Sequence, residues 1–259
     1  MNQVFAWCIV PFDAQNRNPE QRITMLQDLG IKKYAYDWRE KHLGEMVSEW
    51  NLAKQNNIKV SAVWLWLDAR TDSVGRLSPS NEHLFQNLDS AGLQTQIWLS
   101  FNNNYFDSLS QDQALAKGID IVRYIAERAD QLKCTVALYN HGSWFGDPEN
   151  QIRIIQAIPG KDMGIVYSFH HAHPQLDRYP QLIEAMMPYL KAVNLNGMKR
   201  EGPMILPINE GDEEQAMIKL LLAKGYTGPL GILGHVDSLD VKGVLAKNLS
   251  GLKLVLDKR

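Results

Sequence analysis

The sequence contains few cysteines and no long apolar run. Its 259 residues include two cysteines, Cys8 and Cys134, and both lie in apolar segments typical of strands. We expect two buried free thiols, since this pair forms no Cys-x-x-Cys metal or redox motif. No run of about 18 apolar residues is present, so we expect no membrane-spanning segment.

An excess of charge of one sign is also missing. The 27 Lys and Arg residues nearly balance the 29 Asp and Glu residues, which leaves a formal net charge of -2. Without a basic stripe, neither nucleic acid nor an anionic membrane is an expected partner. The first 18 residues lack the basic segment and cleavage site of a signal peptide. We therefore expect a cytoplasmic protein, with an exported chain that has lost its signal peptide as the alternative.

Two common catalytic motifs are absent as well. The segment after the first expected strand, VPFDAQNRNP, is not the Gly-rich phosphate-binding turn of a doubly wound sheet. Ser143 in HGSWFG lacks the Gly-x-Ser-x-Gly frame of a nucleophile elbow. These absences argue against a dinucleotide-binding enzyme and a serine hydrolase.

Apolar runs and amphipathic segments alternate along the whole chain. Strands are expected at 4–11, 33–38, 59–67, 94–101, 134–141, 164–170, 191–196 and 229–235. Helices are expected at 19–29, 44–56, 79–91, 112–132, 149–158, 176–190, 213–224 and 240–256. Asn18-Pro19 and Ser78-Pro79 are typical helix starts. Eight strand–helix pairs predict an α/β fold, a single (β/α)8 TIM barrel over residues 1–259.

Functional residues of such a barrel lie where the strands end and in the loops that follow. The expected strand ends are polar and aromatic: Pro11 to Asp13, Tyr36 to Glu40, Trp64 to Asp68, Ser100 to Phe106, Tyr139 to Gly146, Ser168 to His173, Asn194 to Gly197 and Gly234 to Asp237. Five of the seven histidines fall at three of these ends. Aromatic rings stack on sugar faces, while amides and imidazoles bind hydroxyl groups. A small carbohydrate or keto-sugar is the expected ligand.

Four segments resemble the xylose isomerase-like TIM barrels, a superfamily of sugar isomerases and epimerases. They are VALYNHGSWFG, MGIVYSFHHAH, KAVNLNGM and LLLAKGYTGPLGIL, all between Cys134 and Leu256. The resemblance implies a divalent metal held by Glu, Asp, His and Glu, with two carboxylates that move protons between neighbouring sugar carbons. At the matching positions this chain has Tyr139, Ser168, Asn194 and Leu233. These do not replace the ligands of a hard cation, so we predict no metal cofactor.

His141 and His171 remain at the matching positions. We predict that one of them, or Asp37, removes a proton next to a sugar carbonyl, with Tyr139 and Asn140 among the donors to the resulting oxyanion. Asn196 is a further expected donor. The other expected substrate contacts are Trp66, Asp68, Trp144, His173, Asn194 and His235.

Several alternatives stay open at this point. The histidines could be structural, or His141, His171 and His235 could hold zinc or manganese in a rebuilt site, for which three imidazoles suit zinc. The barrel could also bind a sugar without chemistry. Arg39 is either a clamp on the ligand or part of a rim ion-pair network with Glu40. The loop with Lys199, Arg200 and Glu210 is either a lid or a solvated loop, and a homodimer is an analogy from similar barrels.

Overall fold

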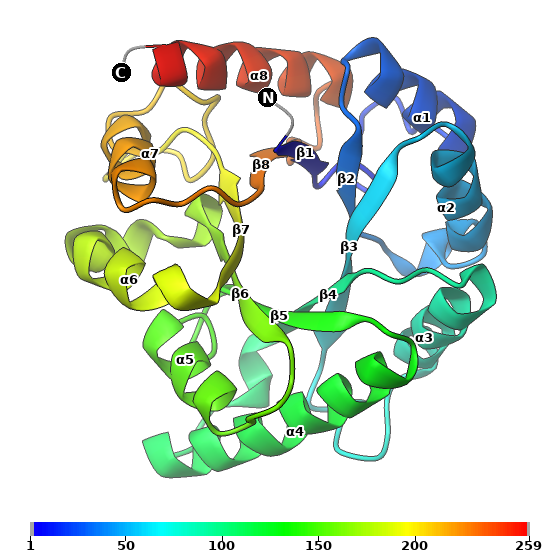
Figure 1. Cartoon of the computed structure of the whole chain (residues 1–259), viewed down its shortest axis with the longest axis vertical. Coiled ribbons are helices and arrows are strands. Elements are labelled where there is room, and N and C mark those ends of the chain that lie inside the picture. Colours follow the sequence, from blue (N-terminus) through cyan, green and yellow to red (C-terminus); the bar gives the residue numbers. More distant parts are fainter. Residues whose placement is uncertain (1–2, 258–259) are drawn as a thin grey trace.

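The computed structural model describes residues 3–257 and shows a closed parallel barrel (Figure 1). The strands in barrel order are β1 Val4–Trp7, β2 Lys33–Tyr36, β3 Lys59–Leu67, β4 Gln96–Phe101, β5 Thr135–Tyr139, β6 Met163–Ser168, β7 Leu190–Leu195 and β8 Leu230–Leu233. Parallel pairing of β1 with β8 closes the sheet, with Ala6 opposite Ile232. The predicted TIM barrel is confirmed.

Eight helices of the described chain surround the strands (Figure 1). They are α1 Pro19–Asp28, α2 Met46–Gln55, α3 Pro79–Ala91, α4 Gln111–Gln131, α5 Pro148–Gln156, α6 Tyr179–Met186, α7 Glu214–Ala223 and α8 Val241–Asp257. The predicted caps are present, since the Asn18 side chain accepts from Gln21 N and the Ser78 side chain accepts from Asn81 N. Each cap satisfies a backbone N–H that the first helical turn leaves unpaired.

Alternate residues of the strands point into the barrel and fill it. The inward set is Phe5, Trp7, Ala35, Ala62, Trp98, Ala137, Tyr139, Val166, Ala192 and Leu233. The three largest rings form one cluster, in which Trp7 lies 4.9 Å from Trp98 and 5.8 Å from Tyr139 between ring centroids. Alanines on β2, β3 and β7 leave the room that these rings occupy. The lumen is therefore an aromatic core, not a channel.

Several predicted strands end earlier than expected, and one predicted helix is divided. The strand predicted at 4–11 ends at Trp7, because Cys8 adopts a left-handed backbone with φ of 56° that interrupts the ladder. The strand predicted at 164–170 ends at Ser168, and a 3-10 turn over Phe169–His171 follows it. The helix predicted at 176–190 is three pieces: 3-10 turns flank α6, with Pro180 and Pro188 near the starts of the second and third pieces.

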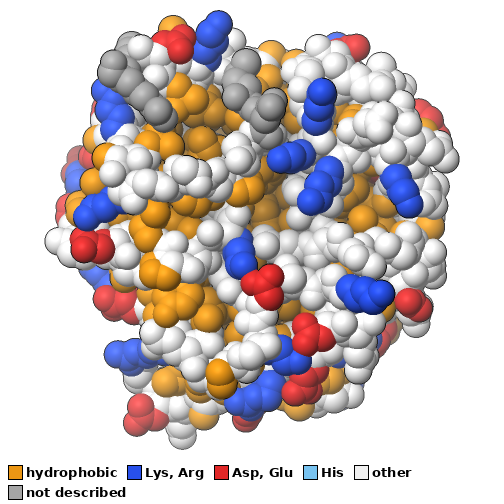
Figure 2. Space-filling view, viewed as in Figure 1, with side chains coloured by type: hydrophobic (Ala, Val, Ile, Leu, Met, Phe, Trp, Pro, Cys, Tyr) orange, Lys and Arg blue, Asp and Glu red, His pale blue; other side chains and the backbone are white. Residues whose placement is uncertain are grey.

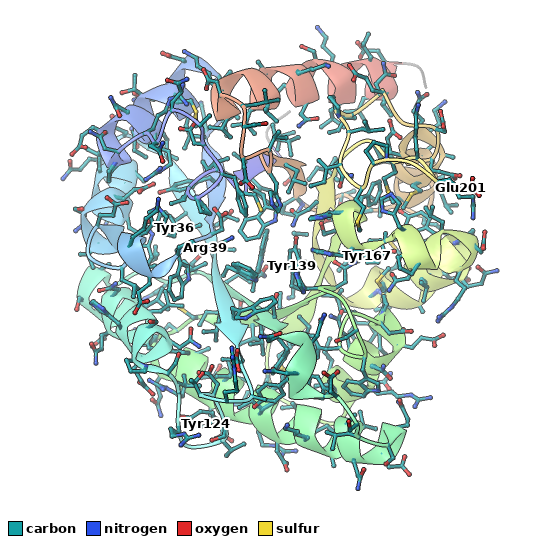
Figure 3. The ribbon with its side chains drawn as sticks, turned by 180° about the vertical axis from the view of Figure 1, so that it is seen from behind. Tyr36, Arg39, Tyr124, Tyr139, Tyr167 and Glu201 are labelled. Carbon is teal, nitrogen blue, oxygen red and sulfur yellow. The ribbon has the colours of Figure 1, made fainter. Side chains whose placement is uncertain are left out.

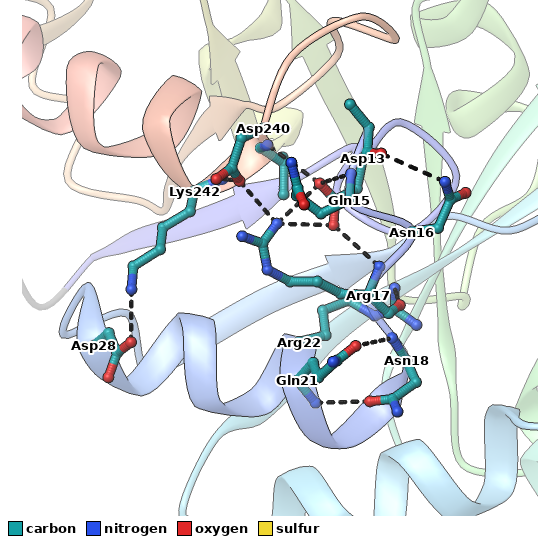
Figure 4. A network of polar contacts seen from close by, with 12 residues as sticks. Asp13, Gln15, Asn16, Arg17, Asn18, Gln21, Arg22, Asp28, Asp240 and Lys242 are labelled. Carbon is teal, nitrogen blue, oxygen red and sulfur yellow. Dashed lines mark hydrogen bonds and ion pairs between the residues drawn. The ribbon is translucent and has the colours of Figure 1, made fainter.

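A polar network joins the first and last loops at the carboxyl end of the barrel (Figure 4). The buried Asp13 carboxylate accepts from Arg17 Nη1 at 2.9 Å and from Val241 N at 3.3 Å. Arg17 also pairs with Asp240 at 2.8 Å, immediately before α8. These contacts connect the loop after β1 to the start of α8, next to the point where β1 and β8 close the barrel.

The five histidines of the strand ends lie toward the end of the barrel that carries the β-to-α loops. We call this end the mouth. Figure 2 shows the side of the molecule seen in Figure 1, where acidic, basic and apolar side chains are mixed and no described histidine is in view. Figure 3 looks from behind and shows Tyr139 inside the ring of strands and Arg39 at its edge near β2.

No helix in the described part of the chain combines the length and the apolar character that a membrane-spanning segment needs. Cys8 and Cys134 are both buried free thiols, as expected.

Candidate active site at the barrel mouth

Four histidines from three strand ends form a row across the mouth. The ring centroids of His141 and His171 lie 4.4 Å apart, and His171 stacks on His170 at 4.3 Å. His235 lies 5.3 Å beyond His170 and stacks on Phe12 at 3.7 Å. The predicted histidine cluster is therefore one continuous row, with His141 and His235 at its two ends.

Burial keeps this row uncharged at neutral pH. Desolvation lowers the pKa of His141 and His235 below the ordinary value of 6.5. The pKa of His170 falls to about 4 by burial and by the neighbouring imidazoles, and the same causes lower the pKa of His171 further. Neutral imidazoles can accept a proton or a hydrogen bond, which is what a general base requires.

The four residues that the sequence resemblance places at the family's metal-ligand positions are Tyr139, Ser168, Asn194 and Leu233. The Tyr139 hydroxyl accepts a hydrogen bond from Trp7 Nε1 at 3.1 Å, and Ser168 and Asn194 lie beside it. Asn194 passes close to the chain at Gly231, where a Cβ atom would lie 2.1 Å from Asn194 Oδ1. Leu233 belongs to the same lumen cluster as Tyr139.

This donor set does not suit a divalent metal. It offers a phenol whose pKa burial raises, a hydroxyl, an amide and an aliphatic side chain. Over residues 3–257, no three His, Cys, Asp or Glu side chains are placed to hold a metal ion. The alternative set of His141, His171 and His235 does not converge, because His170 lies between His171 and His235.

Asp37 is fully buried beside Cys8, next to the mouth. One carboxylate oxygen accepts from Val10 N at 3.3 Å, and the other has no partner among the described residues. Desolvation raises the pKa of Asp37 to about 7, although the nearby Arg39 opposes this rise. Burial and the neighbouring Asp37 raise the pKa of the Cys8 thiol. Asp37 does not line the cavity described next.

An open cavity of about 490 Å³ lies on the side of the mouth formed by the loops after β2 and β3. His141 lines it, and Trp66 lies against His141 with 4.7 Å between ring centroids. The cavity residues are Trp38, Arg39, Glu40, Trp64, Trp66, Asp68, Thr71, Asp72, Ser78, Ser80, Asn81 and His141. Its volume is in the range of about 300–1,000 Å³ that is usual for small-molecule sites.

Hydrogen bonds hold the cavity wall in place. The buried Asp72 carboxylate accepts from Asp68 N and Ser78 N, which fixes the loop between β3 and α3. Trp38 Nε1 donates to Trp64 O at 2.7 Å, and Ser80 Oγ bonds Glu40 Oε1 at 3.1 Å across the outer edge. A site fixed in this way needs little ordering when a ligand binds.

Arg39 is a clamp candidate rather than half of an ion pair with Glu40. Its guanidinium carbon lies 5.0 Å from the Phe12 ring centroid and 5.7 Å from that of Trp64, and its Nη1 donates to Trp38 O. His42 Nδ1 accepts from the Arg39 backbone N–H at 2.9 Å and fixes its position. Most guanidinium donors of this exposed side chain are therefore available to a ligand.

Several predicted contact residues have structural partners instead. Both amide atoms of Asn140 bond the backbone of Ser168 and so connect the ends of β5 and β6. Asn196 Nδ2 donates to Gly197 O and Met204 O, within the loop after β7. Trp144 packs on Phe106 and bonds Gln111 at the start of α4, away from the cavity. Asn140, Asn196 and Trp144 therefore do not line the cavity.

Two more predicted residues lie at the edges of the site. Asp68 lines the cavity, where its carboxylate accepts from Arg70, Asn102 and Asn104, and the bond from Arg70 is the main reason that its pKa is lowered. Both ring nitrogens of His173 are buried without a described partner. His173 is near enough to His170 to lower its pKa but does not line the cavity.

Trp38, Arg39 and Glu40 fall within the predicted strand end from Tyr36 to Glu40, whereas Ser80 was not among the predicted site residues. Ser80 lies in the first turn of α3 and lines the cavity. The predicted helix start at Ser78-Pro79 was a signal for this position, because a helix that begins directly after a strand-end loop lies at the mouth. Nothing in the sequence indicated that the first turn of α3 faces the loop after β2.

The chain matches the family model described as xylose isomerase-like TIM barrel over residues 82–252. None of the curated protein sequences matches it significantly. Among solved structures, it is similar to 3-keto-D-glucoside 4-epimerase YcjR from E. coli, with 15% identity, a TM-score of 0.72 and coverage of 97% of this chain and 99% of that one.

Two further structures show the same fold. One is the IolI protein with a bound zinc atom, at 10% identity and a TM-score of 0.75, with 99% of this chain and 98% of that chain covered. The other is D-psicose 3-epimerase with D-tagatose from Clostridium cellulolyticum H10, at 13% identity and a TM-score of 0.67, with 98% of each chain covered. The family match extends over most of the chain, from α3 to α8. This chain belongs to the xylose isomerase-like TIM barrel family.

Proposed function

We propose that this protein is a sugar isomerase or epimerase that moves a proton next to the carbonyl of a keto-sugar, with His141 as the base and without a divalent metal. The observation that carries the proposal is the position of His141, which lines an aromatic cavity at the mouth and is uncharged at neutral pH. The sugar epimerases among the structurally similar proteins support a sugar as the ligand.

His141 is better placed to act as the base than the other candidates. Its Nδ1 is buried without a partner, so Nε2 is the nitrogen that a ligand in the cavity can reach. His171 lies behind His141, and Asp37 is fully buried outside the cavity wall. A base must come within hydrogen-bond distance of the proton that it removes, and His141 is the one of these three candidates that lines the cavity.

The reaction is a balanced proton transfer. The C–H bond next to the carbonyl breaks, its proton moves to His141 Nε2, and the electron pair moves to the carbonyl oxygen to give an enediolate. Arg39, on the same cavity, provides fixed donors for the negative oxygen. In isomerisation, the proton of the neighbouring hydroxyl moves to the former carbonyl oxygen, and His141 returns its proton to the former carbonyl carbon. In epimerisation, a water molecule on the opposite face protonates the original carbon, and the proton held by His141 neutralises the hydroxide that this leaves.

The donor set at the family's metal position supports a reaction without metal. Tyr139 keeps its proton and is bonded to Trp7, and Ser168 and Asn194 are neutral. The Arg39 guanidinium and the neutral His141 imidazole, both at the cavity, would together perform the functions that the resemblance assigns to a metal ion and two carboxylates.

The test is hydrogen exchange in deuterated water with a panel of keto-hexoses and keto-pentoses, followed by NMR. We expect the wild-type protein to exchange the proton next to the carbonyl, and His141→Gln to lose exchange by about 100-fold or more. His83→Gln, on the exposed side of α3, is the matched control. Saturable sugar binding without exchange by the wild-type protein would instead identify a sugar-binding barrel.

A further inference from the structure

We infer that the substrate is a glycoside, a keto-sugar joined to a second sugar ring, and that this second ring binds at the outer end of the cavity. The inference rests on the proposed function for the position of the reacting ring at His141. The outer subsite itself consists of Trp38, Glu40 and Ser80, from the loop after β2 and the first turn of α3.

The cavity is larger than one sugar ring. His141 and Trp66 lie 4.7 Å apart between ring centroids in its wall, and Trp38, Glu40 and Ser80 line it as well. A volume of about 490 Å³ suits a ligand larger than one ring. A ring that contacts His141 and Trp66 therefore leaves room for a second ring against Trp38.

The outer end combines the features that bind a sugar. Trp38 is only partly buried, and its indole N–H is already bonded to Trp64 O, so its orientation is fixed. The bond between Ser80 and Glu40 closes the outer edge and places a carboxylate where it can accept from sugar hydroxyls. An aromatic face flanked by fixed polar groups is the usual composition of a small-molecule site.

The charges favour a neutral second ring over an anionic group. Arg39 is the one basic side chain of the cavity, and three carboxylates, Glu40, Asp68 and Asp72, line the same space. A phosphate or carboxylate at the outer end would face the Glu40 carboxylate, and like charges repel. Hydroxyl groups can donate to Glu40 and accept from Ser80.

Equilibrium binding tests the subsite without any need for catalysis. We would titrate the protein with glucose, galactose and methyl β-glucoside, and with cellobiose, lactose, maltose, sucrose and trehalose, and follow binding by calorimetry. At least one disaccharide should bind about tenfold more tightly than every monosaccharide. Trp38→Ala should remove most of this difference, and Ser80→Phe, which fills the outer end and retains Trp38, should do the same. Trp144→Ala, which changes a tryptophan outside the cavity, should not.

The outcomes separate this inference from the proposed function. If keto-monosaccharides exchange deuterium but bind as tightly as any disaccharide, the outer subsite is wrong and the proton transfer stands. If no exchange occurs but Trp38→Ala and Ser80→Phe remove a disaccharide preference, the subsite stands and the proposed reaction falls. Failure of every disaccharide to bind, or a preference that survives both variants, overturns the inference.

Discussion

The Tyr139 hydroxyl accepts a hydrogen bond from Trp7 Nε1 at 3.1 Å in the centre of the barrel. Tyr139 stands at a position where the sequence resemblance leads us to expect a metal-binding carboxylate, and the Trp7 ring packs against it. An aromatic pair with one internal hydrogen bond thus stands where a charged group would require a cation. The open cavity lies to one side of this pair, toward the loops after β2 and β3.

The first prediction concerns this hydrogen bond. Tyr139→Phe leaves the buried Trp7 N–H without its acceptor, so we expect the free energy of unfolding to fall by about 1–3 kcal/mol. Urea denaturation measures the loss. Tyr124→Phe, on the periphery (Figure 3), is the control and should cost less, because Tyr124 is only partly buried. Equal stability of Tyr139→Phe and the wild-type protein would show that the bond contributes nothing.

A second prediction tests the structural role of Asn140. Its amide makes two hydrogen bonds to the Ser168 backbone, at 3.1 Å and 2.7 Å, where β5 and β6 end. Asn140→Ala leaves both backbone groups unpaired, and we expect a destabilisation of about 1–3 kcal/mol. Asn51→Ala, at an exposed position of α2, is the comparison. If Asn140→Ala lost sugar binding without losing stability, Asn140 would instead contact the ligand.

The architecture of this chain could be predicted from local signals, whereas the direction of single side chains could not. Pro19 after Asn18 and Pro79 after Ser78 fix two helix starts, and both are present in the structure. The early end of β1 depends on the left-handed backbone of Cys8, a conformation that the residue type does not favour. No sequence rule indicates such a position, because the surrounding packing imposes it.

A third prediction concerns the pH dependence of exchange. His141 must be unprotonated to accept a proton, and burial lowers its pKa below 6.5. We therefore expect kcat/KM for exchange to be constant near neutral pH and to fall with a midpoint below pH 6.5. Trp66→Ala hydrates His141 and should move this midpoint upward, toward pH 6.5. A midpoint at or above 6.5 in the wild-type protein would contradict the role of His141.

A fourth prediction links the histidines to stability. His42 and His170 have a folded pKa of about 4, against an ordinary value of 6.5. Between these values the unfolded chain binds more protons, so the free energy of unfolding should decrease as pH falls from 6.5 to 4. Asp37 has its pKa raised to about 7, so its contribution to the free energy of unfolding increases as pH falls. It is a single group and opposes the effect of the histidines only in part.

Thermal unfolding over this pH range measures the slope. His170→Gln removes one of the histidines with a lowered pKa and should make the decrease of Tm at low pH smaller, while the exposed His83→Gln should leave it unchanged. A slope that is the same in all three proteins would show that burial of His170 does not affect its protonation.

The candidate site could be predicted in part, and the reason is physical. Strand ends in a barrel converge, so the sequence positions of His141, His170, His171 and His235 were enough to place them together. Whether an amide is free or engaged depends on its neighbours in three dimensions. Asn140 follows β5 and bonds the backbone of Ser168, whereas Asn194 lies within β7 beside the Tyr139 hydroxyl.

Deuterium exchange by protein whose metal content has been determined before and after treatment with a chelator distinguishes a reaction without metal from one that needs it. We predict that exchange next to the keto-sugar carbonyl proceeds at the same rate after the chelator has removed any divalent metal, and that His141→Gln abolishes it. Loss of exchange with the metal, and its recovery when zinc or manganese is added back, would contradict this prediction and show that the mouth of this barrel is a metal site.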